Sequence, residues 1–344
     1  MLTAKQNMIE TIRGGKPERF VNQYEALALL FHPYMMTNPR LERGGSAKVN
    51  PWGVTMSYPE HVPAQYPVHT PDKIVVKDIE NWRDYVKAPS LKFDDETWAQ
   101  FKEMYDAVDG TQAFKASFVA PGLFEHSHYL CEIQEALMYY ITNPDEMHEL
   151  LKYVKEWELE LAEGICKHLK PDALFHHDDW GAETSTFMSP GMFAEFFVEP
   201  YKEIYGYYKK NGVELVIHHS DSYAATFVPH MIEMGIDVWQ GCMSANDVPE
   251  MIKKYGGQIA FMGGIDNKFV DFDGWTQADA RKAVREVCDS CGSKYFIPCI
   301  TQGGPGSLYP GAYLALAEEI DLYSEEVFGV KAEEITRLPH VVMF

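Results

Sequence analysis

The chain has 344 residues, of which 46% are hydrophobic and 24% charged, so it can bury a large core and its composition argues against disorder. Its 51 acidic residues outnumber the 30 basic ones, and the net charge of -21 argues against nucleic acid or an anionic membrane as a partner. No apolar run approaches the roughly 20 residues of a membrane span, and the first residues lack the apolar core of a signal peptide. The six cysteines are scattered, which indicates reduced thiols, and we expect a cytoplasmic protein.

Residues 1–100 are predicted to form an N-terminal cap on a single domain that spans residues 1–344. A helix is expected over residues 2–13 and a short strand over residues 19–23. The stretch that follows is rich in proline, glycine and aromatic residues. Turn-forming residues are too frequent there for a helix, and the apolar residues are too irregular for a long strand.

Residues 101–344 are predicted to carry the main βα repeats. Short apolar runs alternate there with longer segments of helical periodicity, as expected for βα units around a parallel sheet. Helices are predicted over residues 144–168 and 190–211, because an Asn-Pro and a Ser-Pro pair mark their starts. The strands are predicted over residues 113–119, 173–177, 215–219, 238–242, 259–263 and 294–300.

Polar residues at the ends of these strands favour a (β/α)8 TIM barrel. Buried parallel strands stay apolar on both faces until their carboxyl ends, where the active site of such barrels lies. Here Ala-Leu-Phe is followed by His-His-Asp-Asp, and Leu-Val-Ile by His-His-Ser-Asp. An open doubly wound sheet would also have polar strand ends, but the number of strands and the single polar mouth favour closure.

The strand over residues 215–219 ends in a candidate metal-binding pair, His219 and Asp221. Residues two apart on an extended backbone point to the same side, so these two side chains could share one ion. One imidazole and one carboxylate suit zinc or a similar divalent metal. The alternative is that the two side chains bind each other or the loop backbone.

The strand over residues 173–177 leads into the candidate catalytic residues His177, Asp178 and Asp179. Imidazoles and carboxylates transfer protons, and two adjacent carboxylates tend to raise the pKa of one of them. The alternative for the aspartates is the N-cap of the next helix. Glu183, in the loop beyond, is a candidate further metal ligand or an ordinary surface residue.

Two cysteines at strand ends are further candidate metal ligands. A thiolate at Cys299 could complete a zinc site with His219, and Cys242 is a second candidate, although buried cysteines are commonly core residues. The Cys288-x-x-Cys291 pair lacks the second pair of a structural zinc site, so we assign it no metal or redox role.

Other residues near the predicted mouth are candidates for binding substrate. Some follow the strands over residues 113–119, 259–263 and 294–300, and a tryptophan would supply an aromatic wall. These candidates are His126, His128, Trp180, Asp266 and Gln302.

Four motifs, taken in chain order, resemble those of the uroporphyrinogen decarboxylase superfamily, and within it the methyltransferases that serve corrinoid proteins. Asn-Pro-Trp-Gly-Val at residues 50–54 is similar to the family's D-x-W-G-V, and Asp-Asp-Trp-Gly at 178–181 to its D-D-x-G. Gly-Gly-Ile-Asp at 263–266 is similar to G-x-I-D, and residues 219–237 match the spacing of H-x-C-G, a helix and G-x-D. The resemblance spans nearly the whole chain.

The chain departs from this family at two places. The R-Q-A-G-R element that grips the substrate's carboxylates in the decarboxylases is absent before Leu41, which disfavours porphyrinogen decarboxylation. The thiol-alkylating methyltransferases bind zinc through H-x-C and a later cysteine, whereas here Asp221 replaces the first cysteine and Gln302 falls where the second belongs. A carboxylate in place of a thiolate leaves more positive charge on a zinc ion, which makes it a stronger Lewis acid.

The resemblance thus implies a methyltransferase that moves a methyl group from a small donor to the Co(I) of a separate corrinoid protein. A methoxyaromatic donor is favoured, and a methylamine remains open, as does a homodimer. The implied cofactors are zinc and the cobalamin of the partner. The metal ligands would be His219 and Asp221, joined by Cys299 or Glu183. The alternatives are a metal-independent lyase that decarboxylates a smaller acid, and a non-catalytic barrel that binds a corrinoid protein or carries a ligand.

Overall fold

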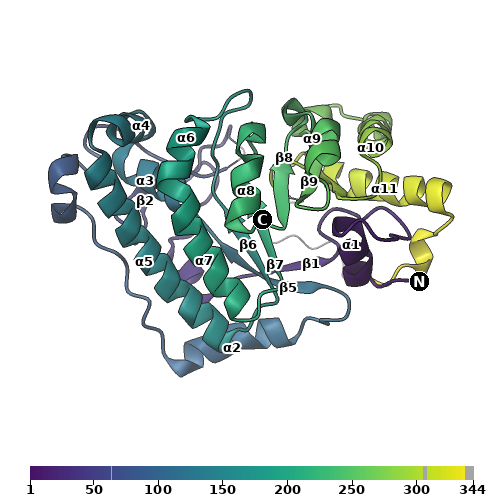
Figure 1. Cartoon of the computed structure of the whole chain (residues 1–344), viewed down its shortest axis with the longest axis horizontal. Coiled ribbons are helices and arrows are strands. Elements are labelled where there is room, and N and C mark those ends of the chain that lie inside the picture. The colour runs from purple at the N-terminus through teal and green to yellow at the C-terminus, as the bar shows by residue number, and fades with distance from the viewer. Residues whose placement is uncertain (63, 305–307, 338–344) are drawn as a thin grey trace.

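Seven parallel strands form one curled sheet in the computed structural model, which describes residues 1–62, 64–304 and 308–337 (Figure 1). Their order is β1-β5-β6-β7-β8-β9-β10, so strands that follow one another along the main part of the chain are neighbours. This barrel-like α/β sheet confirms the predicted TIM-barrel class. The strands are β1 (Leu27–Leu30), β5 (Phe114–Val119), β6 (Ala173–His177), β7 (Leu215–His219), β8 (Val238–Cys242), β9 (Ala260–Ile265) and β10 (Phe296–Ile300).

The edge strands β1 and β10 are linked through Gln23, just before β1. Its backbone N–H donates to the Pro298 carbonyl at 3.3 Å, and its side-chain oxygen accepts from the Ile300 N–H at 3.4 Å. The strand predicted over residues 19–23 is wrong, because Gln23 has a φ of 52°, which ends any extended run. Phe20, within this range, is buried and stacks on Tyr323 at 5.8 Å.

Helices follow one another around the outside of the sheet (Figure 1). The helix predicted over residues 190–211 is interrupted by a π-helical turn, Ala194–Val198. Pro200 lies at the start of the next helix, and a proline removes an N–H and clashes with the carbonyl four residues earlier, which a wider turn relieves. The helices are α1 (Ala4–Ile12), α2 (Asp95–Asp106), α3 (Leu123–Cys131), α4 (Ile133–Thr142), α5 (Pro144–His168), α6 (Pro190–Phe193), α7 (Glu199–Lys210), α8 (Val228–Met234), α9 (Val248–Tyr255), α10 (Gln277–Cys291) and α11 (Ala312–Phe328).

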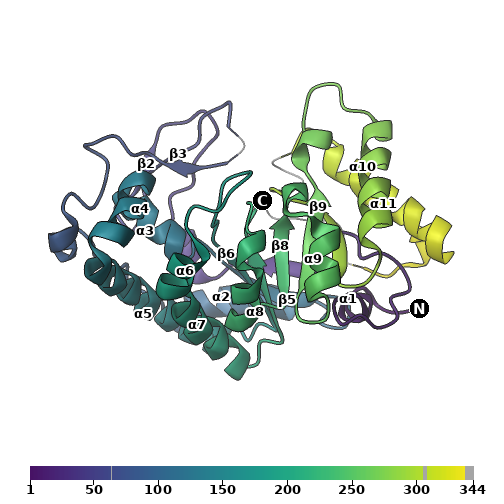
Figure 2. The ribbon, with the colours of Figure 1, turned by 45° about the horizontal axis from the view of Figure 1, so that its top comes forward.

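The N-terminal cap contains a small antiparallel sheet of β2 (Lys48–Val49), β3 (Thr55–Ser57) and β4 (Tyr66–Pro67). Figure 2 shows β2 and β3 beyond α3 and α4, on the side of the molecule toward which the arrow of β8 points. The cap therefore lies on the same side as the carboxyl ends of the parallel strands. Within the described ranges, no helix is both long and apolar enough to cross a membrane.

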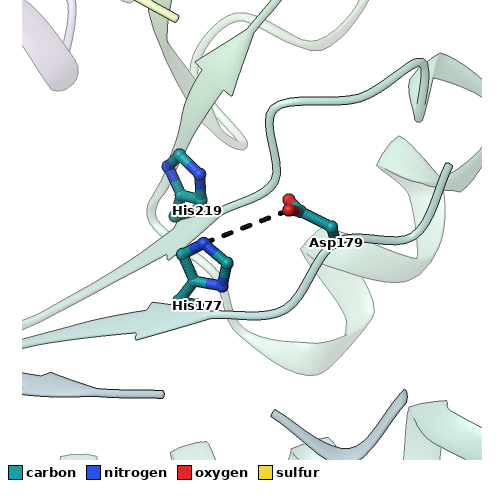
Figure 3. A group of neighbouring side chains, drawn as sticks. All are labelled: His177, Asp179 and His219. Atoms are coloured by element: carbon teal, nitrogen blue, oxygen red, sulfur yellow. Dashed lines mark ion pairs between the residues drawn. The ribbon is translucent and has the colours of Figure 1, made fainter. Parts of the chain in front are cut away.

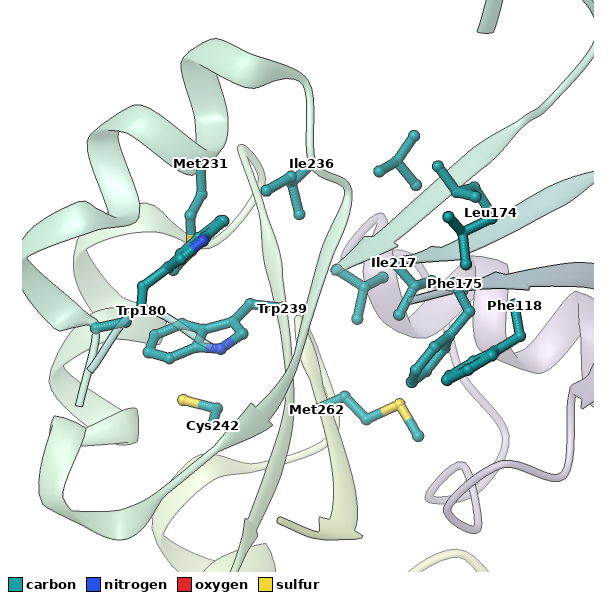
Figure 4. Packing of buried hydrophobic residues seen from close by; sticks show 14 of the residues in the cluster. Phe118, Leu174, Phe175, Trp180, Ile217, Met231, Ile236, Trp239, Cys242 and Met262 are labelled. Atoms are coloured by element: carbon teal, nitrogen blue, oxygen red, sulfur yellow. The ribbon is translucent and has the colours of Figure 1, made fainter. Parts of the chain in front are cut away.

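The core fills both the interior of the sheet and the layer between sheet and helices. Phe118 and Phe175 stack at 5.8 Å inside the curl, whereas Trp180 and Trp239 lie with Met231 toward the helices (Figure 4). Phe175 also lies 6.1 Å from the ring of His219. The apolar interior thus reaches the last residue of β7, and polar residues begin above it.

Candidate functional site

Two histidines and an aspartate meet at the carboxyl ends of β6 and β7 (Figure 3). His177 and His219 are register partners on these parallel strands, and their rings stack at 4.4 Å. Asp179, two residues beyond His177, points back toward the stacked rings (Figure 3). One ligand atom from each of the three side chains lies within 4.8 Å of the other two. The described residues contain no other group of three or more His, Cys, Asp or Glu side chains with metal-binding geometry.

A carboxylate from helix α3 fixes the orientation of His177. Its Nδ1 lies 2.9 Å from Oε2 of the buried Glu125, which leaves Nε2 facing Asp179 Oδ2 at 4.0 Å. The Tyr129 hydroxyl donates to the other oxygen of Glu125 at 3.3 Å. Burial opposes a charge on His177, but the carboxylates of Glu125, Asp179 and Asp221 outweigh it and raise the pKa of His177 to about 10.

An amide from β8 fixes the orientation of His219. Its Nδ1 forms a short hydrogen bond with the carbonyl oxygen of the Gln240 side chain, and the Gln240 amide donates to the Ile300 carbonyl at 3.3 Å. A carbonyl oxygen can only accept, so Nδ1 of His219 carries the hydrogen. Nε2 is then the atom that faces Asp221 Oδ2, at 3.7 Å.

Asp179 and Asp221 lie side by side at the open edge of the site. The backbone N–H of Asp221 donates to Oδ1 of Asp179 at 3.0 Å, and both carboxylates remain about a quarter exposed. Burial and the nearby Asp179 carboxylate raise the pKa of Asp221. No lysine or arginine in the described part of the chain pairs with Glu125, Asp179 or Asp221, so the site is strongly negative and would attract a cation.

Asp178 lies behind this site, in the layer between sheet and helices, and is fully buried. Its oxygens accept from the N–H groups of Phe124 and Glu125 at 3.0 and 2.8 Å, and from the Trp180 indole N–H and the Tyr201 hydroxyl. Burial and the Glu125 carboxylate raise its pKa to about 7. The sequence prediction grouped Asp178 with the catalytic residues, but the structure places it at the start of helix α3, where it holds Glu125 in position.

The other predicted metal ligands do not join the three-residue group. Glu183 is exposed on the loop after β6. Cys299 is fully buried, and burial raises the pKa of its thiol, which keeps the thiol protonated. Cys299 is not part of the group whose ligand atoms lie within 4.8 Å of one another.

The predicted substrate-binding residues are spread over several environments. Trp180 is buried and stacks on His218 at 3.9 Å, and His126 is buried with its ring 5.0 Å from that of Trp52. His128 packs on the Phe124 ring at 5.1 Å. Asp266 is buried and accepts from the backbone and hydroxyl of Ser244, while Gln302 is exposed and bound through its backbone to Asn267.

Sequence reasoning placed Glu125 with His126 and His128 near the cavity, but it assigned no role to Gln240 or Tyr129. Gln240 orients His219, and Tyr129 binds the carboxylate that orients His177. A signal was present for Gln240, because it is the one polar side chain in the otherwise apolar run Val-Trp-Gln-Gly-Cys of β8. An amide buried in such a strand needs hydrogen-bond partners. For Glu125 and Tyr129 the signal is their four-residue spacing, which places both on one face of α3.

Comparison with known proteins places the chain in a family. The family model described as uroporphyrinogen decarboxylase (URO-D) matches residues 50–298. The chain belongs to the uroporphyrinogen decarboxylase family. Among solved structures, a methyltransferase from Methanosarcina mazei is similar with a TM-score of 0.63 at 11% sequence identity, covering 94% of this chain and 99% of that one. This likeness concerns the fold.

A weaker structural similarity, with a TM-score of 0.41 and 13% identity, is to an endo-beta-1,4-mannanase from Cellulomonas fimi, covering 97% of this chain and 77% of that one. A search of curated protein sequences finds no match to the chain.

Proposed function

We propose that this member of the uroporphyrinogen decarboxylase family is a methyltransferase that moves a methyl group from a small methylated donor to the Co(I) of a separate corrinoid protein. The observation that carries the proposal is the negative site of His177, Asp179 and His219 at the carboxyl ends of β6 and β7. The similarity in fold to a methyltransferase supports it. Barrel enzymes of this kind carry their chemistry at those strand ends.

The charge of the site argues against the decarboxylation of a porphyrinogen. A substrate with several carboxylates needs cationic side chains, and Arg is the residue that best matches a carboxylate. In the described residues, the ion pairs of the site involve only histidines and carboxylates. A neutral or cationic methyl donor, by contrast, would not be repelled.

The proposal includes a metal ion, for which zinc is the first candidate on sequence grounds. Such an ion would supply Lewis acidity that polarises the atom from which the methyl group leaves. The residues of the chain itself perform the other tasks. Phe175 closes the floor beneath His219, while the part-exposed Asp179 and Asp221 form the rim through which a donor enters.

The chemical class of the donor has less support than the site. Trp180, which was expected from the sequence to give the pocket an aromatic wall, is buried in the core, and so is Trp52. A methoxyaromatic donor remains part of the proposal, and methylamines belong in the same test.

The proposal is tested by mixing the metal-loaded protein with a reduced corrinoid carrier and a panel of methoxyaromatics and methylamines. The expected result is the methyl-Co(III) absorption spectrum with at least one donor and its absence with Asp179→Asn. The matched control is Glu183→Gln, which removes an exposed carboxylate outside the site and should leave the rate unchanged. Failure of every donor, with carriers of several kinds, would refute the proposal.

A second candidate function is a lyase that decarboxylates a smaller acid without a metal. It is favoured by the family match and by His177, which is hydrogen-bonded to Glu125 and 4.0 Å from Asp179 and so could deliver a proton. Release of CO2 from a small carboxylic acid in the presence of a strong chelator would support the lyase and count against the methyltransferase.

A further inference from the structure

We infer that the protein binds one divalent metal ion through His177 Nε2, Asp179 Oδ2 and His219 Nε2, in place of the expected set with Cys299 and Glu183. The role of this ion in catalysis rests on the proposed function. The binding of the ion does not, because it follows from the positions of the three side chains. Two imidazoles and one carboxylate on three coordination positions leave further positions open for a substrate.

The first argument is that each of the three side chains has one polar atom engaged by the protein and another left for a ligand. His177 uses Nδ1 for Glu125, and His219 uses Nδ1 for Gln240. Asp179 uses Oδ1 for the backbone N–H of Asp221. Metal-binding histidines typically have their second nitrogen held in this way by a carboxylate or an amide oxygen.

The second argument is that ligand atoms of the three side chains converge. His177 Nε2 and Asp179 Oδ2 are 4.0 Å apart, and one ligand atom from each side chain lies within 4.8 Å of the other two. Ligands at about 2.1 Å from a common ion can be at most about 4.2 Å apart. A contraction of several tenths of an ångström, within reach of rotations about the side-chain bonds, therefore completes the site.

The third argument is electrostatic. The two imidazole rings stack at 4.4 Å beside Glu125, Asp179 and Asp221, and the described residues place no lysine or arginine in ion pairs with these carboxylates. A divalent cation bound to the ring nitrogens and to Asp179 would offset the surplus of negative charge, and both imidazoles would be neutral while they bind it. Asp221, whose Oδ2 is 3.7 Å from His219 Nε2, is placed to become a fourth ligand.

The metal preference follows from the ligand atoms. Nitrogen and carboxylate oxygen without sulfur suit zinc, iron(II), cobalt(II) or manganese(II), and give no advantage to thiophilic metals such as copper(I). Cys299 is fully buried and is not part of the group of three, so the ion would lack a thiolate.

The test is titration of the metal-free protein with zinc and with cobalt(II), whose visible spectrum reports its ligands. We expect about one equivalent to bind, without the thiolate-to-cobalt charge-transfer band, and His219→Gln and Asp179→Asn to weaken binding by more than about 100-fold. Cys299→Ser and Glu183→Gln should bind as the wild type does. His230→Gln, on helix α8 outside the site, is the matched histidine control.

Thermal unfolding of each variant distinguishes loss of a ligand from loss of the fold. Loss of metal binding in Cys299→Ser with the fold intact, or a charge-transfer band in the wild type, would overturn the inference in favour of the cysteine set. Absence of metal binding in the folded wild type would also overturn it. Metal binding without methyl transfer would leave this site standing and refute the proposed function. Methyl transfer by a folded wild type that binds no added metal would refute this site and leave the methyl transfer itself standing.

Discussion

Substitution by asparagine should have different effects at the neighbouring residues Asp178 and Asp179. It should lower the stability of the fold at Asp178 and weaken metal binding at Asp179. Asp178 supplies the cap that helix α3 lacks, because its own N-cap residue, Gly122, has no side chain to accept from the first N–H groups. A Cβ on Gly122 would lie 2.5 Å from Cβ of Asp178, so the glycine is what allows this close approach.

The cost of Asp178→Asn can be worked out from its four donors. An asparagine keeps one oxygen that can accept hydrogen bonds. Its NH2 group replaces the other oxygen, and because it can only donate, the N–H and O–H groups that face it lose their acceptor. Loss of a helix cap costs about 1 kcal/mol, and a buried donor without an acceptor costs about 1–3 kcal/mol. We expect the free energy of unfolding to fall by about 3 kcal/mol, a large share of the roughly 5–15 kcal/mol that stabilises a typical domain.

Asp179→Asn should leave stability nearly unchanged. Its side chain is 28% exposed, and the asparagine oxygen can still accept from the backbone N–H of Asp221. Surface substitutions of this kind change the free energy of unfolding by less than about 0.5 kcal/mol. The same substitution should, however, abolish tight metal binding, because it removes one of the inferred ligands.

Urea denaturation followed by tryptophan fluorescence, together with zinc titration, measures both effects. A shift of the urea midpoint at constant m-value gives the change in stability. If Asp178→Asn unfolds at the same urea concentration as the wild type while Asp179→Asn is strongly destabilised, then the placement of Asp178 toward the helices and of Asp179 toward the mouth is refuted.

Three further predictions concern the surroundings of the site. Burial lowers the pKa of His126 to about 4, so between pH 6.5 and 4 the unfolded chain binds a proton there that the folded chain does not. This residue therefore lowers the free energy of unfolding by about 1.4 kcal/mol for each unit by which the pH falls. When urea denaturation is repeated across this pH range, the free energy of unfolding of His126→Gln should depend less steeply on pH, by the contribution of about one proton. Gln240→Leu should weaken zinc binding by about 10–100-fold, because it frees the ring of His219; unchanged affinity in a competition titration would show that the amide has no such role. Glu158 and His176 form a buried pair at 2.7 Å, so Glu158→Leu or His176→Leu alone should cost about 3–5 kcal/mol. The double variant should cost clearly less than the sum in a double-mutant cycle, and simple additivity would refute the coupling.

The strands were predictable because their apolar runs end abruptly. The bounds of β6, β7 and β8 follow directly from runs such as Ala-Leu-Phe before His-His. The edge strand β1 was misplaced because the buried residues before it pack on α11 and carry the same apolar signal. Burial alone cannot distinguish a strand from an extended segment that packs on a helix.

The metal-binding group was only partly predictable, for a reason that lies in the paired histidines. Both β6 and β7 end in His-His, so alternation along a strand predicts that one histidine of each pair faces the interior and the other faces the helices. Alternation also groups His177 with Asp179, and His219 with Asp221. Alternation does not tell whether this set of residues or the set with His176 and His218 faces the interior, because these strands are buried on both faces.

In the structure, His176 and His218 are the histidines that face the helices, as their hydrogen-bond partners show. His176 binds the buried Glu158 of α5 and lies 3.2 Å from the Tyr205 hydroxyl of α7. That hydroxyl also lies 2.8 Å from Nδ1 of His218, whose Nε2 is 3.1 Å from the Asp178 carbonyl. A carbonyl only accepts, so Nε2 of His218 carries a hydrogen.

The hydrogen-bond directions along this outward chain can then be assigned. Burial lowers the pKa of His218, which is therefore neutral, and its Nδ1 accepts from the Tyr205 hydroxyl. The tyrosine oxygen in turn accepts from Nδ1 of His176, whose Nε2 lies 2.7 Å from Oε1 of Glu158. This outward layer ends on the backbone of Asp178, between His177 and Asp179, so that polar groups facing the helices hold in place the two residues that face the mouth. Changes in the outward layer should therefore alter the geometry of the site without contacting any ligand bound there.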